Sequence, residues 1–205
     1  SSSGIVFSVD KLGMLGMLMK RAIALLLVGL TGSPVLAGDI LDAGSQAESL
    51  FEAGNHAKAF AALNKARELV WDDAPLTINK AILVASDPQG FGIYDIRDNN
   101  RYRANEDIVI YTEPSGFAYG RDGDLYVIGM TLDFEVKSTN GESLASQENF
   151  AAWQLRSRVP NKEFMGKITY SFAGIQPGDY IVETRIRDLN SETMTSFPTR
   201  ITIIE

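Results

Sequence analysis

The chain has 205 residues, of which 45% are apolar and 22% charged, enough for one ordinary domain and a small additional element. Its formal net charge is −7, and no cluster of lysine and arginine is interleaved with aromatic residues, so we expect neither nucleic acid nor an anionic membrane surface as a partner. The chain has no cysteine, which excludes disulfides, thiolate catalysis and cysteine-ligated metal centres, and we expect no cofactor.

Residues 19–37, MKRAIALLLVGLTGSPVLA, contain the three parts of a secretory signal peptide. Lys20 and Arg21 form the positive start, residues 22–30 form the apolar core, and Val35-Leu36-Ala37 is a small-residue cleavage site. The apolar core is shorter than the roughly 20 residues that span a bilayer. We therefore expect cleavage and a periplasmic or secreted protein with no transmembrane span, and retention as an N-terminal anchor is the alternative. We expect residues 1–18 to be a mis-called start or an upstream fusion.

Between residues 39 and 71, apolar and small side chains recur every three or four residues, which is typical of amphipathic helices. Gly54-Asn55 interrupts this pattern and predicts a turn between two helices. Ser45, three residues before Glu48, predicts a capping box at a helix start. The pattern predicts a helical hairpin over residues 38–75, which we expect to dock on the domain that follows.

The string from 47 to 69, AESLFEAGNHAKAFAALNKAREL, resembles a single tetratricopeptide-type repeat, with Gly54, Ala59 and Ala66 at the small positions where two helices approach closely. Solenoids of such repeats need about three copies to bury a continuous core. The resemblance therefore implies a lone hairpin, with a peptide-binding groove as the alternative. His56, the one histidine of the chain, is expected to be a solvent-facing polar residue and not a metal ligand.

Over residues 78–205 the pattern becomes an alternation. In Leu125–Val136 the even-numbered residues are all apolar and the odd-numbered ones become steadily more polar, which predicts one long strand whose apolar face needs a second layer. Asn140-Gly141 predicts a hairpin after it. The other predicted strands are Lys80–Ala85, Phe91–Ile96, Asp107–Thr112, Phe150–Arg156, Phe164–Phe172, Tyr180–Arg187 and Thr193–Ile204, the last with Pro198 at an edge or a bulge.

Seven or eight short strands with turns about every ten residues predict a mainly β protein with an immunoglobulin-like antiparallel β-sandwich after the helical hairpin. The segments GFGIYDIRDNN, IVIYTEP, SRVPNKEF and PGDYIVETRIRDLNS all lie between residues 90 and 204. On these segments the chain resembles uncharacterised secreted proteobacterial proteins with a C-terminal Ig-like β-sandwich. The resemblance implies an architecture and an extracytoplasmic location, and it implies no activity.

Aromatic side chains are the candidate contacts to a ligand or partner. Phe117 and Tyr119 lie in a Gly-rich loop at residues 115–124, and loops on a rigid sandwich commonly carry binding residues. Tyr94 and Trp153 are two further candidates. The alternative for all four is that the rings complete the core of the sandwich.

Acidic residues cluster in two predicted turns, with Asp95 and Asp98 in one and Asp122 and Asp124 in the other. Aspartate satisfies loop backbones, and paired-carboxylate catalysis or calcium binding are the alternatives. No nucleophile elbow or phosphate-binding glycine loop is present in the sequence. We assign no catalytic, cofactor-binding or metal-binding residues.

We therefore expect a non-catalytic extracytoplasmic interaction or scaffold module of the bacterial cell envelope and not an enzyme. The expected partner is an envelope protein or a glycan. The alternative is a carbohydrate-binding module that uses the aromatic loop at residues 115–120.

Overall fold

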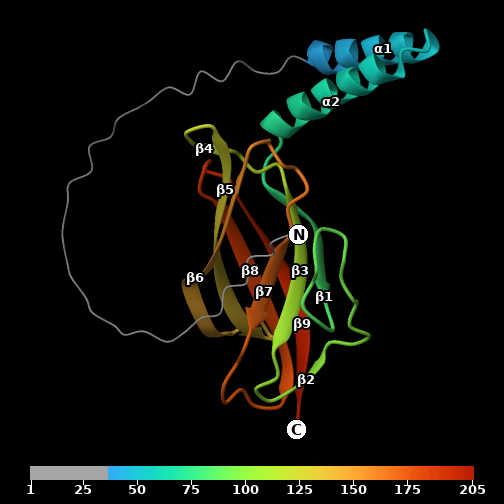
Figure 1. The fold of residues 1–205 in the computed structure, drawn as a ribbon. Helices are drawn as coiled ribbons and strands as arrows, with labels where there is room; N and C mark the ends of the chain where they lie inside the picture. Colours follow the sequence, from blue (N-terminus) through green and yellow to red (C-terminus); the bar gives the residue numbers. More distant parts are fainter. Residues whose placement is uncertain (1–36) are drawn as a thin grey trace, which may run out of the picture. The chain divides into compact units, whose positions relative to one another are not determined.

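The computed structural model describes residues 37–205, which form two compact units that divide between Asp73 and Ala74. The predicted signal peptide lies, apart from Ala37, outside the described residues. Two helices come first, and nine strands follow them (Figure 1). The predicted mainly β class with a preceding helical hairpin is confirmed.

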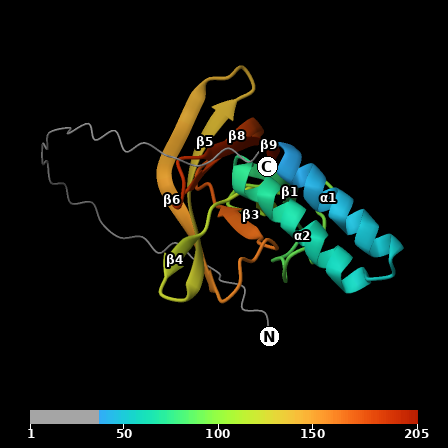
Figure 2. The same cartoon turned by 90° about the horizontal axis from the view of Figure 1, so that it is seen from above.

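The hairpin consists of α1 (Ala37–Glu52) and α2 (His56–Asp73), which lie side by side and antiparallel (Figures 1 and 2). Gly54 ends α1 at a φ of 74°. Its N–H donates to the Phe51 carbonyl at 2.9 Å, and the Asn55 N–H donates to the Leu50 carbonyl at 2.8 Å. These two bonds form a Schellman motif. The predicted turn at Gly54-Asn55 is confirmed, but the predicted capping box is wrong, because Ser45 lies in the middle of α1.

Small side chains hold the two helices together. Ala43, Ala47 and Ala59 are buried, and residues without long side chains let two helix backbones approach closely. Large apolar side chains on the hairpin remain exposed, namely Leu41, Phe51, Phe60, Leu63 and Val70. Neither of these two helices is long and apolar enough to cross a bilayer. Docking of the hairpin on the β-unit stays a prediction.

Two sheets make up the β-unit. The smaller sheet has the order β1-β3-β7, and the larger has the order β2-β9-β8-β5-β4, with β6 also paired to β5. The strands are β1 (Thr77–Leu83), β2 (Arg101–Arg103), β3 (Ile108–Ser115), β4 (Gly120–Asp122), β5 (Leu125–Ser138), β6 (Ser143–Ser157), β7 (Gly166–Tyr170), β8 (Gly178–Asp188) and β9 (Met194–Ile204).

The order of the strands gives the immunoglobulin-like topology. The first, third and seventh strands form one sheet, whereas β5, β6, β8 and β9 form the other. The chain changes sheets between β1 and β2, and β2 pairs with the last strand in parallel, while the other strand pairs are antiparallel. Two such sheets, with consecutive strands divided between them, give the sandwich architecture of immunoglobulin-like domains.

The predicted strand at Leu125–Val136 is confirmed as β5, which lies in the interior of the larger sheet between β8 and β6. Its even-numbered residues Ile128, Met130 and Leu132 are buried, and Leu132 is 0% exposed. The Tyr170 and Thr184 hydroxyls join the two sheets at 2.7 Å. The Asn140-Gly141 hairpin is also confirmed, with Gly141 at a φ of 90°.

Two predicted strands differ from the structure, and the proline predicted at an edge or a bulge of the last strand has a physical explanation. The first strand begins at Thr77 and ends at Leu83, earlier than predicted. Phe91–Ile96 is not a strand, because it forms only isolated bridges around a turn in which Gly92 has a φ of 73°. Pro198 lies opposite Glu183 of β8, and β2 pairs with β9 only at Thr202–Ile204, so within the described chain no strand pairs with the proline on the β2 side of β9.

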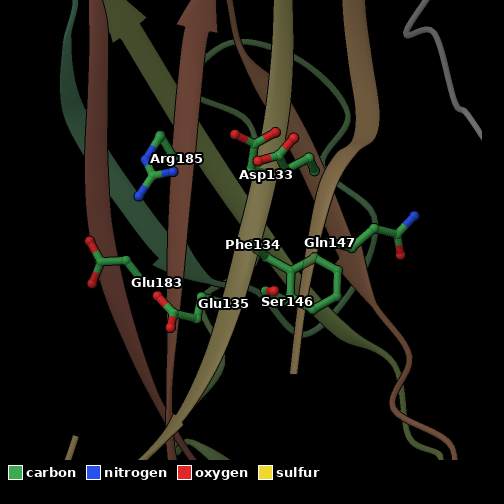
Figure 3. Close-up of a pocket in the computed structure, with 8 residues that line it drawn as sticks. Asp133, Phe134, Glu135, Ser146, Gln147, Glu183 and Arg185 are labelled. Carbon is green, nitrogen blue, oxygen red and sulfur yellow. The ribbon is translucent and has the colours of Figure 1, made fainter. Parts of the chain in front are cut away.

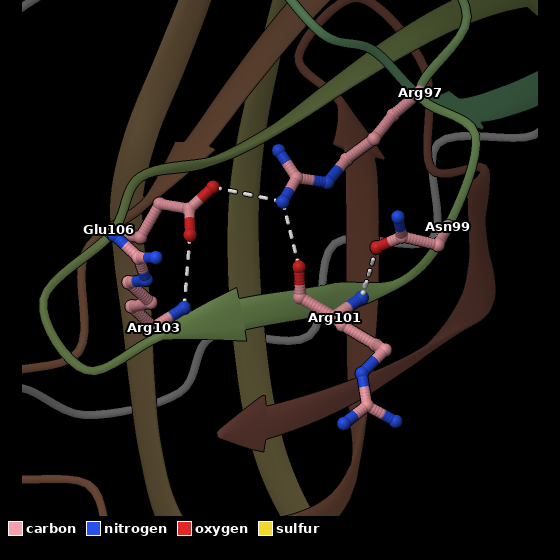
Figure 4. A network of polar contacts seen from close by, with 5 residues as sticks. All are labelled: Arg97, Asn99, Arg101, Arg103 and Glu106. Carbon is pink, nitrogen blue, oxygen red and sulfur yellow. Dashed lines mark hydrogen bonds and ion pairs between the residues drawn. The ribbon is translucent and has the colours of Figure 1, made fainter. Parts of the chain in front are cut away.

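Arg97 fixes the loop that leads into β2 (Figure 4). Its Nη2 donates to the Arg101 carbonyl at 2.6 Å and forms an ion pair with Glu106 at 2.8 Å. The guanidinium also lies 4.1 Å from the centre of the Tyr102 ring, which is 1% exposed. The loop at residues 97–101 is therefore closed by the carboxylate of Glu106, beyond β2, and not by the nearby Asp95 or Asp98.

Candidate functional site

The sequence-predicted aromatic residues lie largely in the core. Phe117 is 1% exposed and its ring lies 5.9 Å from that of Phe164. Trp153 is 8% exposed, and its Nε1 donates to the Lys167 carbonyl at 3.3 Å. Burial of these two rings fits the alternative that they complete the core of the sandwich, and it leaves them little surface for contact with a ligand.

Tyr119 and Tyr94 are only partly buried. The Tyr119 hydroxyl donates to the Asn161 carbonyl at 3.0 Å, and its ring lies edge-on to Phe117. Tyr94 stacks on Tyr111 with ring centres 4.2 Å apart. The structure thus links Phe117, Tyr119 and Trp153 through one aromatic group, and it holds Tyr94 in a separate contact, so the four do not form one surface.

The acidic turns serve the local structure. Asp122 on β4 pairs with Arg156 on β6 at 3.1 Å, and Asp95 accepts a hydrogen bond from Ser86 at 3.0 Å. Gly123 between Asp122 and Asp124 has a φ of 57°, as a tight hairpin turn requires. These contacts support the interpretation that the predicted acids satisfy their turns.

A depression on the outer face of the larger sheet is a better candidate for a site. It has a volume of about 250 Å³ and lies over β5, β6 and β8 (Figure 3). Its lining residues are Asp133, Phe134, Glu135, Ser146, Gln147, Glu148, Glu183 and Arg185. Four of these eight side chains are carboxylates and one is a guanidinium, so the depression is acidic.

A β-bulge in β6 shapes this depression. Leu132 pairs with Ala151 and Phe134 pairs with Gln147, so three residues of β6 stand opposite Asp133 alone. Asn149, in the middle of the bulge, has a φ of 50°, in the left-handed region that asparagine tolerates better than most residues. Bulges of this kind break the ladder and redirect side chains, often beside functional sites.

Asp133 lines the depression and is only 4% exposed. Its Oδ1 accepts a hydrogen bond from the Asn149 N–H at 2.7 Å and forms an ion pair with Arg187 at 2.9 Å. Arg187 also donates to the Asn149 side-chain oxygen at 2.9 Å. The second carboxylate oxygen, Oδ2, is buried and has no hydrogen-bond partner within the described part of the chain.

The surrounding charges are arranged on adjacent strands. Glu135 and Glu183 stand directly opposite each other, an arrangement that like charges disfavour. The hydroxyl of Ser143 and then the ammonium of Lys137 hold the pKa of Glu135 below its ordinary value. Figure 3 shows Arg185 and Glu183 on β8, beside Asp133 and Glu135 on β5.

This arrangement suits binding by charge and hydrogen bonds. Within residues 37–205, no three histidine or acidic side chains gather closely enough to hold a metal ion. The depression is lined by Asp133 with its unsatisfied, buried carboxylate oxygen, by the exposed Glu148 of the bulge, by the partly exposed Glu135 and Glu183, and by the Arg185 guanidinium. It can therefore accept hydrogen bonds from a positively charged or hydroxyl-bearing group.

Sequence reasoning missed this site, although part of its signal is visible. The odd-numbered residues of β5 become acidic towards its end, and Glu183, Arg185 and Arg187 alternate along β8. Two adjacent strands with charged outer faces indicate a polar surface. The alternation cannot indicate the bulge that buries Asp133.

No protein-family model and no curated protein matches this chain. Among solved structures, it is similar to an alkylpurine DNA glycosylase of Pseudomonas fluorescens bound to DNA containing an abasic site analog, with 11% identity over 78% of this chain and 42% of that chain, at a TM-score of 0.34. It is also similar to a superoxide reductase of Ignicoccus hospitalis, with 7% identity, 64% and 81% coverage and a TM-score of 0.33.

A third similar structure is the CARDB domain of a Pyrococcus furiosus protein in complex with di-metal ions, with 8% identity, coverage of 65% of this chain and 96% of that chain, and a TM-score of 0.27. The chain spans 42% of the length of the glycosylase and 50% of that of a Bacillus subtilis sporulation control protein.

Proposed function

We propose that this protein is a non-catalytic interaction module of the bacterial cell envelope, and that the outer face of β5, β6 and β8 is its partner-binding surface. The observation that carries the proposal is the acidic depression at Asp133. A buried carboxylate oxygen without a donor is costly, and a bulged strand that maintains such a group beside an open depression is a feature that binding would explain. The partner class is an envelope protein.

The expected location rests on the sequence. Residues 19–37 have the positive, apolar and small-residue parts of a secretory signal. The resemblance of residues 90–204 to uncharacterised secreted proteobacterial proteins supports the same location. Both observations favour a protein that works in the periplasm or outside the cell.

The non-catalytic role rests on the side chains of the depression. Its acids are accompanied by serine, glutamine and arginine, and no histidine lies among them. His56 belongs to the helical hairpin, where its ring lies 5.0 Å from that of Phe51. The group that most often acts as a general base near neutral pH is therefore not among the lining residues.

Site-specific photo-crosslinking in intact cells tests the proposal. A photoreactive residue replaces Gln147, which is exposed and lines the depression, and the matched control replaces Asp124, an exposed residue in the β4–β5 turn. We expect a reproducible crosslinked envelope protein from position 147 and not from position 124. The same products from both positions, or none from position 147 in an exported and folded protein, would overturn the proposal.

A further inference from the structure

We infer that the depression at Asp133 receives a basic side chain of the partner protein, with the guanidinium of an arginine as its best-fitting occupant. This inference rests on the proposed function, because it names the chemistry that the same surface recognises.

Within the part of the chain that the structure describes, the carboxylate of Asp133 has hydrogen-bond partners on only one of its two oxygens. An ionised carboxylate has room for about four hydrogen bonds, two on each oxygen. Oδ1 already accepts from the Asn149 N–H and the Arg187 guanidinium, whereas Oδ2 has no donor within residues 37–205. Asp133 lines the depression, so a group that enters it can supply the missing donors.

The neighbouring cationic side chains of the chain make contacts with groups other than Asp133 Oδ2. Arg187 is fixed between Asp133 Oδ1 and the Asn149 side-chain oxygen, both at 2.9 Å. Arg185 stands opposite Asp133 in the strand register, yet the ion pair of Asp133 is with Arg187. Lys137 pairs with Glu135 at 3.2 Å. The chain's own nearby positive charges thus leave Oδ2 without a partner.

The residues that line the depression carry a net negative charge. The lining carries four carboxylates, at positions 133, 135, 148 and 183, against the single guanidinium of Arg185. Neither Glu148 nor Glu183 forms an ion pair in the part of the chain that the structure describes. Two acids near an unsatisfied carboxylate favour a cation, and Arg185 at the wall lies where it can meet a carboxylate of the same partner.

The spacing of the acids in the depression favours a guanidinium over a metal ion. A metal ion needs several oxygens within one short radius, and the acids of the depression are too dispersed for that. A guanidinium is planar and carries five N–H donors in a fixed fork, so it can reach acceptors that are spread over a larger surface. A depression of about 250 Å³ has room for such a group.

Amide chemical shifts of the exported protein, titrated with short peptides, test the inference. The probe is the blocked tripeptide Gly-Arg-Gly, and the matched control is Gly-Gln-Gly. We expect saturable shifts at residues 133, 147 and 183–185 with the arginine peptide, and at least tenfold weaker binding of the glutamine peptide. Asp133→Asn is expected to weaken arginine binding at least tenfold, and Asp124→Asn is expected to leave it unchanged.

A second variant keeps the test decisive if Asp133→Asn does not fold. Glu183→Gln leaves the hydrogen bonds of Asp133 intact, and we expect it to weaken binding of the arginine peptide about threefold to tenfold. Equal binding of both peptides would overturn the inference. Shifts at the same residues with calcium chloride or an oligosaccharide, and none with the arginine peptide, would also overturn it.

This experiment and the crosslinking experiment fail separately. A crosslinked partner whose contacting segment has no basic residue would leave the proposed function standing and overturn the guanidinium. Arginine binding in solution without any crosslinked partner in cells would overturn the proposed function.

Discussion

Replacing Gly166 with alanine is expected to destabilise the β-unit by about 2–4 kcal/mol. A Cβ atom at this position would lie 2.2 Å from Cη2 and 2.3 Å from Cζ2 of Trp153. Carbon atoms in contact are about 3.5–4.0 Å apart, so the indole would have to move by roughly 1.3 Å. The ring is 8% exposed and packs against Phe164, so it has little room to move.

The magnitude is the sum of two effects. Overpacking of a core costs about 1–3 kcal/mol. Displacement of the indole also weakens the hydrogen bond from Trp153 Nε1 to the Lys167 carbonyl, which contributes about 1 kcal/mol. Backbone strain adds nothing, because Gly166 is not in the left-handed region.

Urea unfolding followed by far-UV circular dichroism measures this change, provided that the slope with denaturant is unchanged. Gly129→Ala is the matched control, since that glycine also lies in a strand and its nearest contact would be the exposed Leu189 side chain at 3.4 Å. In a Trp153→Phe background the smaller ring does not reach Gly166, so the same substitution should cost less than half as much. A Gly166→Ala protein within about 0.5 kcal/mol of the wild type would refute the packing argument.

Leu132→Asp should abolish folding of the β-unit, because Leu132 is 0% exposed. Thr131→Asp, on the other face of β5, should give a folded protein. A soluble Leu132→Asp protein that unfolds cooperatively would contradict this prediction. Tyr102→Phe should leave stability unchanged or raise it by about 1 kcal/mol, since the hydroxyl of Tyr102 is buried without a hydrogen-bond partner in the described chain. Tyr170→Phe should instead cost about 1–2 kcal/mol, because it removes the bond to the Thr184 hydroxyl, and thermal unfolding distinguishes the two variants. The folded-state pKa of Glu135 lies below the ordinary 4.5, so its contribution to stability is present above pH 4.5 and is lost as the pH falls through the lowered pKa. Glu135→Gln should therefore show a shallower loss of stability in acid, and identical acid-unfolding profiles would argue against the contacts of Glu135.

Alkaline titration gives one further prediction. Burial raises the pKa of Tyr102 to about 12, and burial also raises that of Tyr111 to about 12, although the hydroxyl of Tyr111 accepts a bond from the Gly92 N–H. A tyrosine whose pKa is raised in the folded state contributes to stability. This contribution is fully present below pH 10, the ordinary pKa, and is lost as the pH rises from 10 towards 12. Ultraviolet difference spectra should show fewer phenolates in the native than in the unfolded protein in this range. Equal phenolate counts would contradict the burial of these rings.

The long strands and tight turns of this protein can be predicted from sequence because their signals are local. β5 alternates over residues 125–136, and Asn140-Gly141 supplies the φ above zero that its hairpin needs. The start of α1 could not be predicted from Ser45, because a serine that resembles a cap is also tolerated inside a helix. Local patterns thus predict which helices and strands exist better than they predict where each one begins and ends.

The candidate site could not be predicted, because its chemistry depends on residues that are far apart in the chain. Asp133 accepts hydrogen bonds from Asn149, 16 positions away, and from Arg187, 54 positions away. No local pattern indicates that an aspartate on the polar face of a strand will be 4% exposed. Phe117 is a second example, since its Gly-rich surroundings leave exposure and burial of the ring both open, and its contact is with Phe164, 47 positions away.

The bulge in β6 also bears on the solubility of the protein. β6 pairs only with β5 in the described chain, so one of its edges presents free backbone groups. Glu148 is the one charged residue between Leu144 and Leu155, and a long, straight edge of low charge is a template for intermolecular strand pairing. The bulge at residues 148–150 divides this edge into two short segments and places its charge at the break. A bulge and a charge in the middle of an edge strand disfavour intermolecular strand pairing, so the distortion beside Asp133 is also of the kind that keeps an exposed sheet edge from associating.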